Sequence, residues 1–186
     1  MRMFSNVGID LNMLEGRMRS GSIVLNGKPV LFRFLRDQDQ PRWIEFVKSC
    51  SPGSLWLRFL QPFSPTPERA ERFCRFDPER EWAVVAEIEE PRRTFIAVCR
   101  LIRCFARDEA EYAVIVADPW QKMTLGRILT ELCIDLAKTL DFKIVNADTV
   151  WENFPMTKIL NRCHFKLKMK EENMINLFLN LGNHPR

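Results

Sequence analysis

The chain has 186 residues, 46% of them hydrophobic, and a formal net charge of +4. This length and composition predict one globular domain with a buried core, and a charge this small gives no reason to expect nucleic acid as a partner. Six cysteines form no C-x-x-C pair and the chain has two histidines, so the sequence argues against a zinc site and predicts that no metal is needed.

The sequence shows no signal peptide and no membrane span. Residues 1–12 lack a long apolar core, and no window approaches the roughly 20 apolar residues that a spanning helix requires. Cysteines within apolar patterns, such as Cys99 and Cys133, predict reduced thiols rather than a disulfide framework. We therefore expect a cytoplasmic protein without a membrane partner.

The first 28 residues are expected to form an N-terminal extension to a domain at residues 29–186. Glycines interrupt this extension and its apolar periodicity is weak, so a docking arm is one interpretation. Asn26-Gly27 is a strong hairpin signal, which predicts that a strand at 23–25 pairs with one at 30–35.

Turn signals and apolar periods divide the rest of the chain into helices and strands. Asp37–Asp39 offers N-cap chemistry to a helix that is expected to end at Ser51-Pro52-Gly53. The patterns that follow predict, in order, a short apolar segment at 54–59, a helix at 67–76, strands at 81–88, 94–104 and 111–117, a helix at 124–140, a strand at 144–150, a helix at 154–163 and a closing hairpin of strands at 165–171 and 174–181. The strand, helix and strand between 111 and 150 make a right-handed βαβ unit, and the fold class is mixed α/β.

The loop between the strand at 111–117 and the helix at 124–140 suggests a ligand site. It reads Gln121-Lys-Met-Thr-Leu-Gly-Arg127, which places a glycine in the first helical turn. First-turn N–H groups lack intrahelical partners and the helix dipole is positive there, so such a terminus attracts phosphate. The alternative is an ordinary strand-to-helix turn in which Gly126 serves packing.

Several segments resemble GNAT N-acetyltransferases. The loop is similar to the family's Gln/Arg-x-x-Gly-x-Gly/Ala, and Glu152-Asn153-Phe-Pro-Met156 is similar to its Asn-x-x-Met helix. Ser51-Pro-Gly-Ser-Leu-Trp-Leu-Arg-Phe59 and Asp77-Pro-Glu-Arg-Glu-Trp-Ala-Val-Val-Ala86 resemble Pat-type bacterial protein lysine acetyltransferases. The resemblance implies the GNAT fold, in which a mixed, mostly antiparallel central sheet contains a βαβ coenzyme A-binding unit and carries helices on both faces.

The same resemblance implies acetyl-coenzyme A as the cosubstrate. Its pyrophosphate is expected at the loop, its pantetheine arm along the strand that precedes the loop, and a side-chain contact at Asn153, for which helix capping is the alternative role. The implied coenzyme-binding residues are Val114, Ile115, Val116, Gln121, Lys122, Met123, Thr124, Leu125, Gly126, Arg127 and Asn153.

Glu111 matches the family's catalytic glutamate in position. An attacking amine must be neutral, whereas a free lysine has a pKa of about 10.4, so a base must take a proton directly or through water. Partial desolvation at the start of an apolar strand would raise the pKa of Glu111 toward that role. The alternative is a solvated acid at the end of a strand.

Three positions depart from the family pattern. Thr124 replaces the first loop glycine, Leu160 stands near the place where many members carry a proton-donating tyrosine, and His164 replaces a glycine. Leucine cannot donate a proton, so an acyl-coenzyme A sensor with little catalysis is one alternative function.

The sequence thus predicts an N-acyltransferase that moves an acetyl or short acyl group directly to an amine. The Pat likeness indicates a protein lysine as the acceptor, with a small-molecule amine as the alternative, and a homodimer stays open. Arg58, among aromatic neighbours, is expected to pair with an acid structurally, with substrate orientation as the alternative.

Overall fold

The computed structural model contains one eight-stranded sheet in the described part of the chain, which comprises residues 23–75, 77–89, 91–106 and 108–182 together with Met13, Glu15, Gly16 and Met18. The strand order is β1-β2-β3-β4-β5-β6-β8-β7. The strands are β1 (Ile23–Leu25), β2 (Lys28–Phe34), β3 (Glu81–Ile88), β4 (Thr94–Arg103), β5 (Glu109–Val116), β6 (Ile144–Val150), β7 (Lys166–Glu171) and β8 (Met174–Asn180). Within this sheet β5 and β6 pair in parallel and all other neighbours pair antiparallel, which confirms the predicted mixed, mostly antiparallel sheet.

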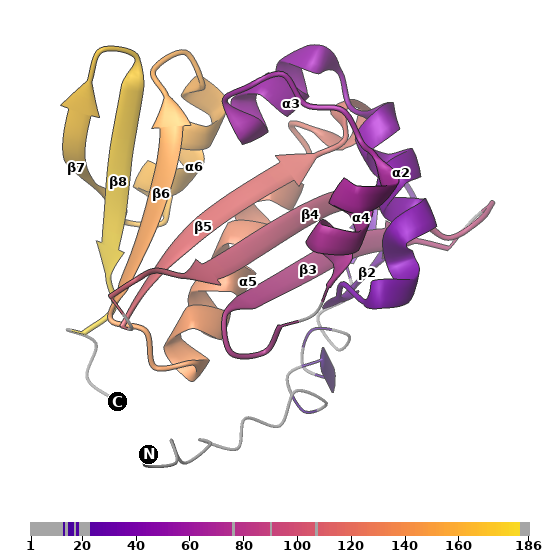
Figure 1. Cartoon of the computed structure of the whole chain (residues 1–186), viewed down its shortest axis with the longest axis horizontal. Helices are drawn as coiled ribbons and strands as arrows, with labels where there is room; N and C mark the ends of the chain where they lie inside the picture. Colours follow the sequence, from indigo (N-terminus) through magenta and orange to yellow (C-terminus); the bar gives the residue numbers. More distant parts are fainter. Residues whose placement is uncertain are drawn as a thin grey trace.

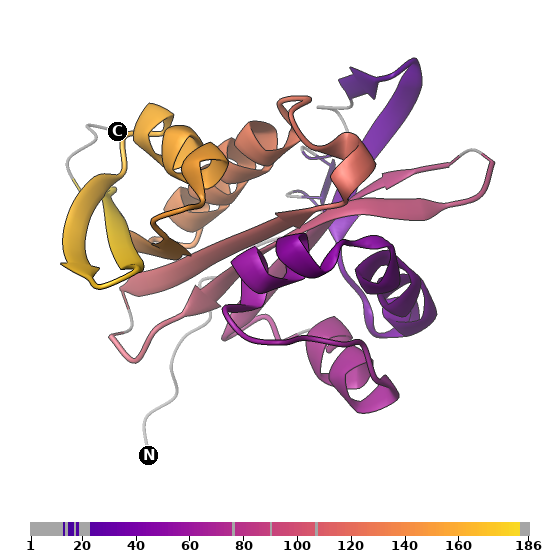
Figure 2. The same ribbon diagram turned by 90° about the horizontal axis from the view of Figure 1, so that it is seen from above.

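Helices cover both faces of the sheet, as predicted (Figures 1 and 2). Three pack on one face, namely α2 (Gln40–Ser49), α3 (Pro52–Phe59) and α4 (Pro67–Cys74), and two on the other, namely α5 (Leu125–Thr139) and α6 (Phe154–Arg162). Short 3-10 turns at Asp37–Asp39 and Asp118–Trp120 precede α2 and α5. Among the described residues, no helix combines the length and hydropathy that crossing a membrane would take.

Strand alternation supplies a separate core to each face. Along β3, Val84 packs with the residues of α5, whereas the next residue, Val85, packs with those of α2 and α4. Both side chains are fully buried, since successive strand residues point to opposite faces and each face is covered. The stripe of apolar residues predicted for α5 closes the first core, with Leu125, Leu129 and Cys133 all at most 1% exposed.

The hairpin at Asn26-Gly27 forms as predicted. Ile23 pairs with Val30, and both turn residues have positive φ, at 50° for Asn26 and 74° for Gly27. Two positive φ values are what a tight hairpin turn demands, and asparagine and glycine tolerate them. Much of the predicted extension lies outside the described residues, so its separation from the domain stays a prediction.

The segment at 54–59 differs from the expectation, because it is the body of α3 rather than a short apolar stretch. Ser51 is the N-cap, and its hydroxyl oxygen accepts a bond from Ser54 N at 3.2 Å, while Pro52 occupies the first turn. Ser-Pro ends one helix and begins the next, since serine caps and proline suits a first helical turn.

Candidate active site

Strands β5 and β6 part halfway along their length. Their parallel pairing covers Glu109 to Glu111 on β5 and stops at the pair Glu111 and Asn146. Beyond it β5 stays paired with β4 as far as Val116, and β6 stays paired with β8 as far as Val150. The inner edge of β5 after Glu111 therefore has no strand partner.

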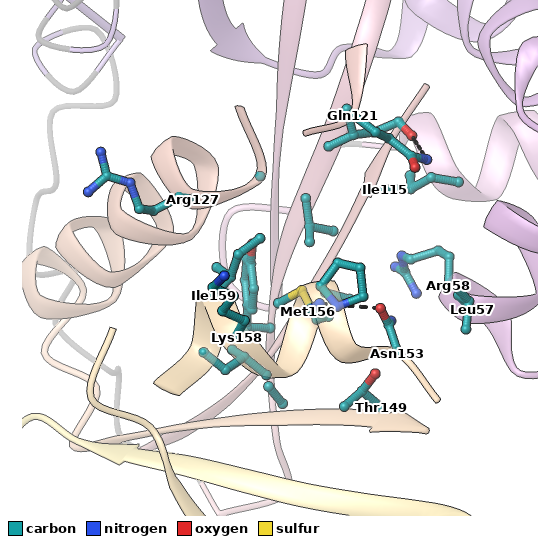
Figure 3. Close-up of a pocket in the computed structure, with 18 of the residues that line it drawn as sticks. Leu57, Arg58, Ile115, Gln121, Arg127, Thr149, Asn153, Met156, Lys158 and Ile159 are labelled. Carbon is teal, nitrogen blue, oxygen red and sulfur yellow. Dashed lines mark hydrogen bonds between the residues drawn. The ribbon is translucent and has the colours of Figure 1, made fainter. Parts of the chain in front are cut away.

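A cavity of about 470 Å³ occupies this opening (Figure 3). Its volume lies within the roughly 300–1,000 Å³ range of small-molecule sites. The walls come from α3, β5, the start of α5, β6 and α6, and they include Ser54, Leu57, Arg58, Tyr112, Ala113, Val114, Ile115, Val116, Gln121, Lys122, Thr124, Gly126, Arg127, Ala147, Asp148, Thr149, Asn153, Met156, Ile159 and Leu160.

The start of α5 presents free backbone donors to this cavity. The first α-helical bond runs from Ile128 N to Thr124 O at 3.0 Å, so the N–H groups of residues 125–127 precede the intrahelical ladder. Thr124 caps the helix in the left-handed region, at a φ of 65°, and its hydroxyl bonds the carbonyl of Met123 rather than a helix amide. Glycine adopts that conformation more easily than a β-branched residue, which explains the glycine in the family loop.

Gly126 lies where α5 approaches α6 and β5. A Cβ at this position would come 3.2 Å from Cδ1 of Ile159 and 4.0 Å from Cγ2 of Val116. The glycine therefore serves close packing and also leaves the mouth of the cavity open, so the two interpretations of its role do not exclude each other.

The rest of the predicted loop divides between lining and support. Lys122 and Arg127 line the cavity, and Arg127 also pairs with Glu131 at 3.4 Å on the surface. Leu125 is 1% exposed and belongs to the core, so only its backbone can serve a ligand. Neither it nor Met123 is among the lining residues.

Gln121 holds the loop against α3. Its Nε2 donates to Ser54 Oγ at 2.9 Å and to Val116 O at 3.0 Å. Asp118 accepts from the hydroxyls of Ser51 and Ser54 at 2.6 and 2.9 Å, and hydrogen bonds from these hydroxyls and from Ser51 N lower its pKa against the effect of partial burial. The two serines of the Pat-like segment thus fasten α3 to the turn that begins α5.

Two polar side chains line the cavity from β6 and the start of α6, and only one of them has a hydrogen-bond partner among the described residues. Asn153 caps α6, since its Oδ1 accepts from Met156 N at 3.3 Å, and it also lines the cavity, so both roles proposed for it are compatible. Thr149 on β6 is 1% exposed, and its hydroxyl has no hydrogen-bond partner among the described residues. A buried polar group without a partner costs about 1–3 kcal/mol, so a bound ligand that accepts or donates there would recover that energy.

Glu111 lies at the closed end of the opening. It is exposed and does not line the cavity, whereas its neighbours Tyr112 and Ala113 do. Its pKa is raised, chiefly because surrounding protein removes water from the carboxylate and secondly because Asp148 repels it, while Arg58 acts in the opposite direction. A raised pKa suits a base, and a water molecule could bridge its carboxylate to the cavity.

The cavity offers few hydroxyl donors on its α5 side. Leu160 is fully buried, and Tyr112 OH already shares a hydrogen bond with Thr130 Oγ1 at 2.9 Å. Burial raises the pKa of Tyr112 well above its usual range. Neither side chain can supply the proton that a tyrosine at position 160 would supply.

Several polar lining residues lie outside the predicted site residues, among them Ser54, Asp148, Thr149, Lys158 and Arg162. Arg58 makes no hydrogen bond or ion pair with the described residues, and its guanidinium points into the cavity (Figure 3). The structural acid partner expected for it is therefore missing from the described part of the chain. Of the polar lining residues, Ser54 belongs to the Pat-like segment, and for Arg58 in the same segment substrate orientation is the alternative role.

The fold and the site together define a class of protein. A sheet that opens between two parallel strands, beside a helix start with free amides, leaves a cavity with room for an extended ligand. The Acetyltransferase (GNAT) domain family matches residues 30–166, and the chain belongs to this family, whose members use acetyl-coenzyme A. The family predicted from the sequence is thereby confirmed.

Individual relatives agree with this assignment. An acetyltransferase of Pseudomonas aeruginosa is 28% identical over 120 residues, which cover 63% of this chain and 64% of that protein, less than two thirds of its length. The GNAT domain of S. lividans PAT shares the fold with a TM-score of 0.79 and 24% identity, over 87% of this chain and 96% of that one. Spermidine N-acetyltransferase from Vibrio cholerae, in complex with CoA and spermine, has a TM-score of 0.67 and 15% identity, over 81% of this chain and 95% of that one.

Proposed function

We propose that the protein transfers an acetyl group from acetyl-coenzyme A to an amine, and that the amine is a lysine side chain of a protein. One observation carries the proposal: a single cavity runs from the free amides at the start of α5, along the unpaired edge of β5, to Asp148 beside Glu111. This path offers protein groups suited to the phosphates, the thioester arm and the amine.

The wall formed by α5 and β5 suits the coenzyme. The amides of residues 125–127 and the charges of Lys122 and Arg127 would replace the water lost by a pyrophosphate. The edge of β5 at 114–116 has no strand partner, although Val116 O already accepts from Gln121, and it would bond the peptide-like pantetheine arm as a neighbouring strand would. Opposite, the Thr149 hydroxyl and the Asn153 side chain would bond polar groups of the same arm.

The chemistry needs one base and no covalent enzyme intermediate. The acceptor enters as an ammonium group, and Glu111 takes its proton through water. The neutral nitrogen then attacks the thioester carbonyl carbon, a C–N bond forms and the C–S bond breaks. The thiolate leaves and takes up the second proton, which the nitrogen loses as it becomes an amide. The products are an N-acetyl amide and coenzyme A, with no change of oxidation state.

The likeness of residues 51–59 and 77–86 to Pat-type enzymes supports a protein lysine as the acceptor. A small amine is the competing acceptor, and a structural relative is named for spermidine. Location in the cytoplasm belongs to the same proposal, and six free cysteines, five of them buried, agree with a reducing compartment. A homodimer stays open.

A second candidate function rests on Leu160. A buried leucine at the place of the proton donor favours an acyl-coenzyme A sensor that binds its ligand and barely catalyses. The sensor and the enzyme share the coenzyme site and differ in turnover.

Calorimetry with acetyl-coenzyme A, followed by a thiol-release assay with lysine-bearing proteins and with polyamines, separates these candidates. We expect binding together with thiol release that depends on a protein acceptor. Release with polyamines alone would move the acceptor to small amines, and binding without release from any acceptor would favour the sensor.

A further inference from the structure

Arg58 differs from the two buried arginines on its face of the sheet, Arg33 and Arg100. Arg33 is bound by Asp39 at 2.7 Å and by Glu87 at 3.0 Å, and Arg100 is bound by Glu81 and by the carbonyl of Phe73. Arg58 makes no ion pair or hydrogen bond with any described residue, and its guanidinium lies 4.9 Å from the ring of its neighbour Phe59. A guanidinium presents five hydrogen-bond donors and stays charged. A partly enclosed guanidinium without an acceptor is therefore suited to binding an anionic ligand.

The position of Arg58 makes the coenzyme phosphates an unsuitable partner. Of the groups suited to phosphate, Lys122, Arg127 and the amides of residues 125–127 lie at the start of α5, and Lys158 and Arg162 line the cavity from α6. Arg58 comes from α3 on the opposite wall, with its side chain directed into the cavity across from Arg127 (Figure 3). The anion that it binds therefore arrives from the acceptor side.

The neighbours of Arg58 indicate what else that ligand carries. Helix α3 contacts both β5, which carries Glu111, and β6, which carries Asp148. Burial lowers the pKa of Arg58, and Glu111 is the leading charged group that opposes this shift. The charge of Asp148, which lines the same cavity as Arg58, helps to raise the pKa of Glu111. Two carboxylates suit an ammonium group, and the guanidinium beside them suits a carboxylate.

We propose that Arg58, Glu111 and Asp148 form a subsite for a lysine with an acidic residue beside it in the acceptor protein. The lysine ammonium faces the two carboxylates, and the neighbouring aspartate or glutamate binds the guanidinium, preferably through both oxygens. This inference rests on the proposed transfer to lysine and adds a charge requirement to the acceptor.

Binding and chemistry are coupled in this arrangement. Arg58 lowers the pKa of Glu111, which weakens it as a base. An acceptor carboxylate on Arg58 would screen that charge and restore the basicity of Glu111 when the correct acceptor is present. Acceptors without the acid would bind less tightly and also react more slowly.

The test uses pairs of lysine peptides that differ only in Asp against Asn, placed one to three residues from the lysine on either side. Binding is measured by calorimetry on the full chain saturated with coenzyme A, so that no turnover is needed, and kcat/KM is measured separately with acetyl-coenzyme A. For the best-placed acid we expect about tenfold tighter binding than for its Asn counterpart, as for one charge-assisted hydrogen bond. Arg58→Gln should abolish the preference, Arg58→Lys should keep part of it, and neither should change acetyl-coenzyme A affinity more than about twofold.

Arg72→Gln, on the exposed surface of α4, is the matched control and should keep the full preference. Equal binding of every Asp and Asn pair, a preference that survives Arg58→Gln, or no peptide binding at all would overturn the inference. Weaker coenzyme binding in Arg58→Gln would overturn it too, because the guanidinium would then serve the coenzyme. Selective binding without acetylation would leave the subsite standing and defeat the proposed transfer, whereas acetylation without selectivity would do the reverse.

Discussion

The two walls of the cavity offer different chemical groups to a ligand. The wall of β5 and α5 offers mainly backbone groups, which are the unpaired edge of a strand and the amides of residues 125–127. The wall of α3 and β6 offers side chains, among them Arg58, which has no partner among the described residues, and Asp148, whose charge helps to raise the pKa of Glu111 outside the cavity. A wall of backbone depends on the fold and tolerates many sequences, whereas a wall of charged side chains changes its specificity with one substitution.

The sharpest way to separate the walls is to disable the carboxylate of Glu111. Glu111→Gln should lower kcat by about 10²–10⁴-fold, the usual contribution of a general base, and leave acetyl-coenzyme A affinity nearly intact. Thiol-release kinetics and calorimetry measure the two quantities. Glu152→Gln, an exposed acid beside α6, is the control and should change neither. Unchanged turnover in Glu111→Gln would leave Asp148 as the group to test next.

A substitution in the wall of β5 and α5 should instead lower acetyl-coenzyme A affinity. In Gly126→Val the new side chain would meet Ile159, already 3.2 Å from a Cβ, and would crowd the cavity mouth. We expect acetyl-coenzyme A affinity to fall at least about tenfold and the free energy of unfolding to fall by about 1–3 kcal/mol, the usual cost of overpacking. Gly126→Ala should show smaller losses, because one methyl group displaces Ile159 by only a few tenths of an ångström. Full affinity in Gly126→Val would remove the start of α5 from the coenzyme site.

Thr149→Val tests whether the hydroxyl on β6 contacts the coenzyme, and it should have two effects of opposite sign. The substitution removes a buried hydroxyl that has no partner among the described residues, so the free protein should become more stable by about 1 kcal/mol. The same change should weaken acetyl-coenzyme A binding severalfold, because a hydrogen bond to the ligand is lost. Thermal unfolding and calorimetry report the two effects. A more stable variant with unchanged affinity would show that the hydroxyl does not meet the coenzyme.

The pH profile should report the electrostatics of the charged wall. The base works when deprotonated, so kcat/KM should rise as pH increases through the raised pKa of Glu111. Asp148→Asn removes the repelling charge, which should lower that pKa and move the rising limb to lower pH. Rate profiles with a protein acceptor measure the shift, and a limb that moves to higher pH would contradict the assignment.

Local signals predicted most of the fold. The Asn26-Gly27 turn and the buried stripe of α5 each depend on residues close together in the sequence, and the structure contains both. The start of α3 differs from the prediction, because Ser51-Pro52 both ends α2 and begins α3, with serine as the cap and proline in the first turn. Local chemistry therefore contained even this signal.

The site was less predictable, because its decisive features are not local. The parting of β5 from β6 after Glu111 depends on which strand each follows, and no single segment encodes it. That Arg58 and Thr149 have no partner among the described residues depends on which side chains the other elements bring near them. The coenzyme role of the loop stays a prediction, and it rests on the general affinity of helix starts for phosphate.

Hydrogen exchange on the full chain, with and without acetyl-coenzyme A, tests most directly whether the opening between β5 and β6 holds the coenzyme. We predict new protection of the amides in residues 112–116 and 124–127, with little change in β1 to β3. Binding that protects other segments and leaves both of these unchanged would contradict the account.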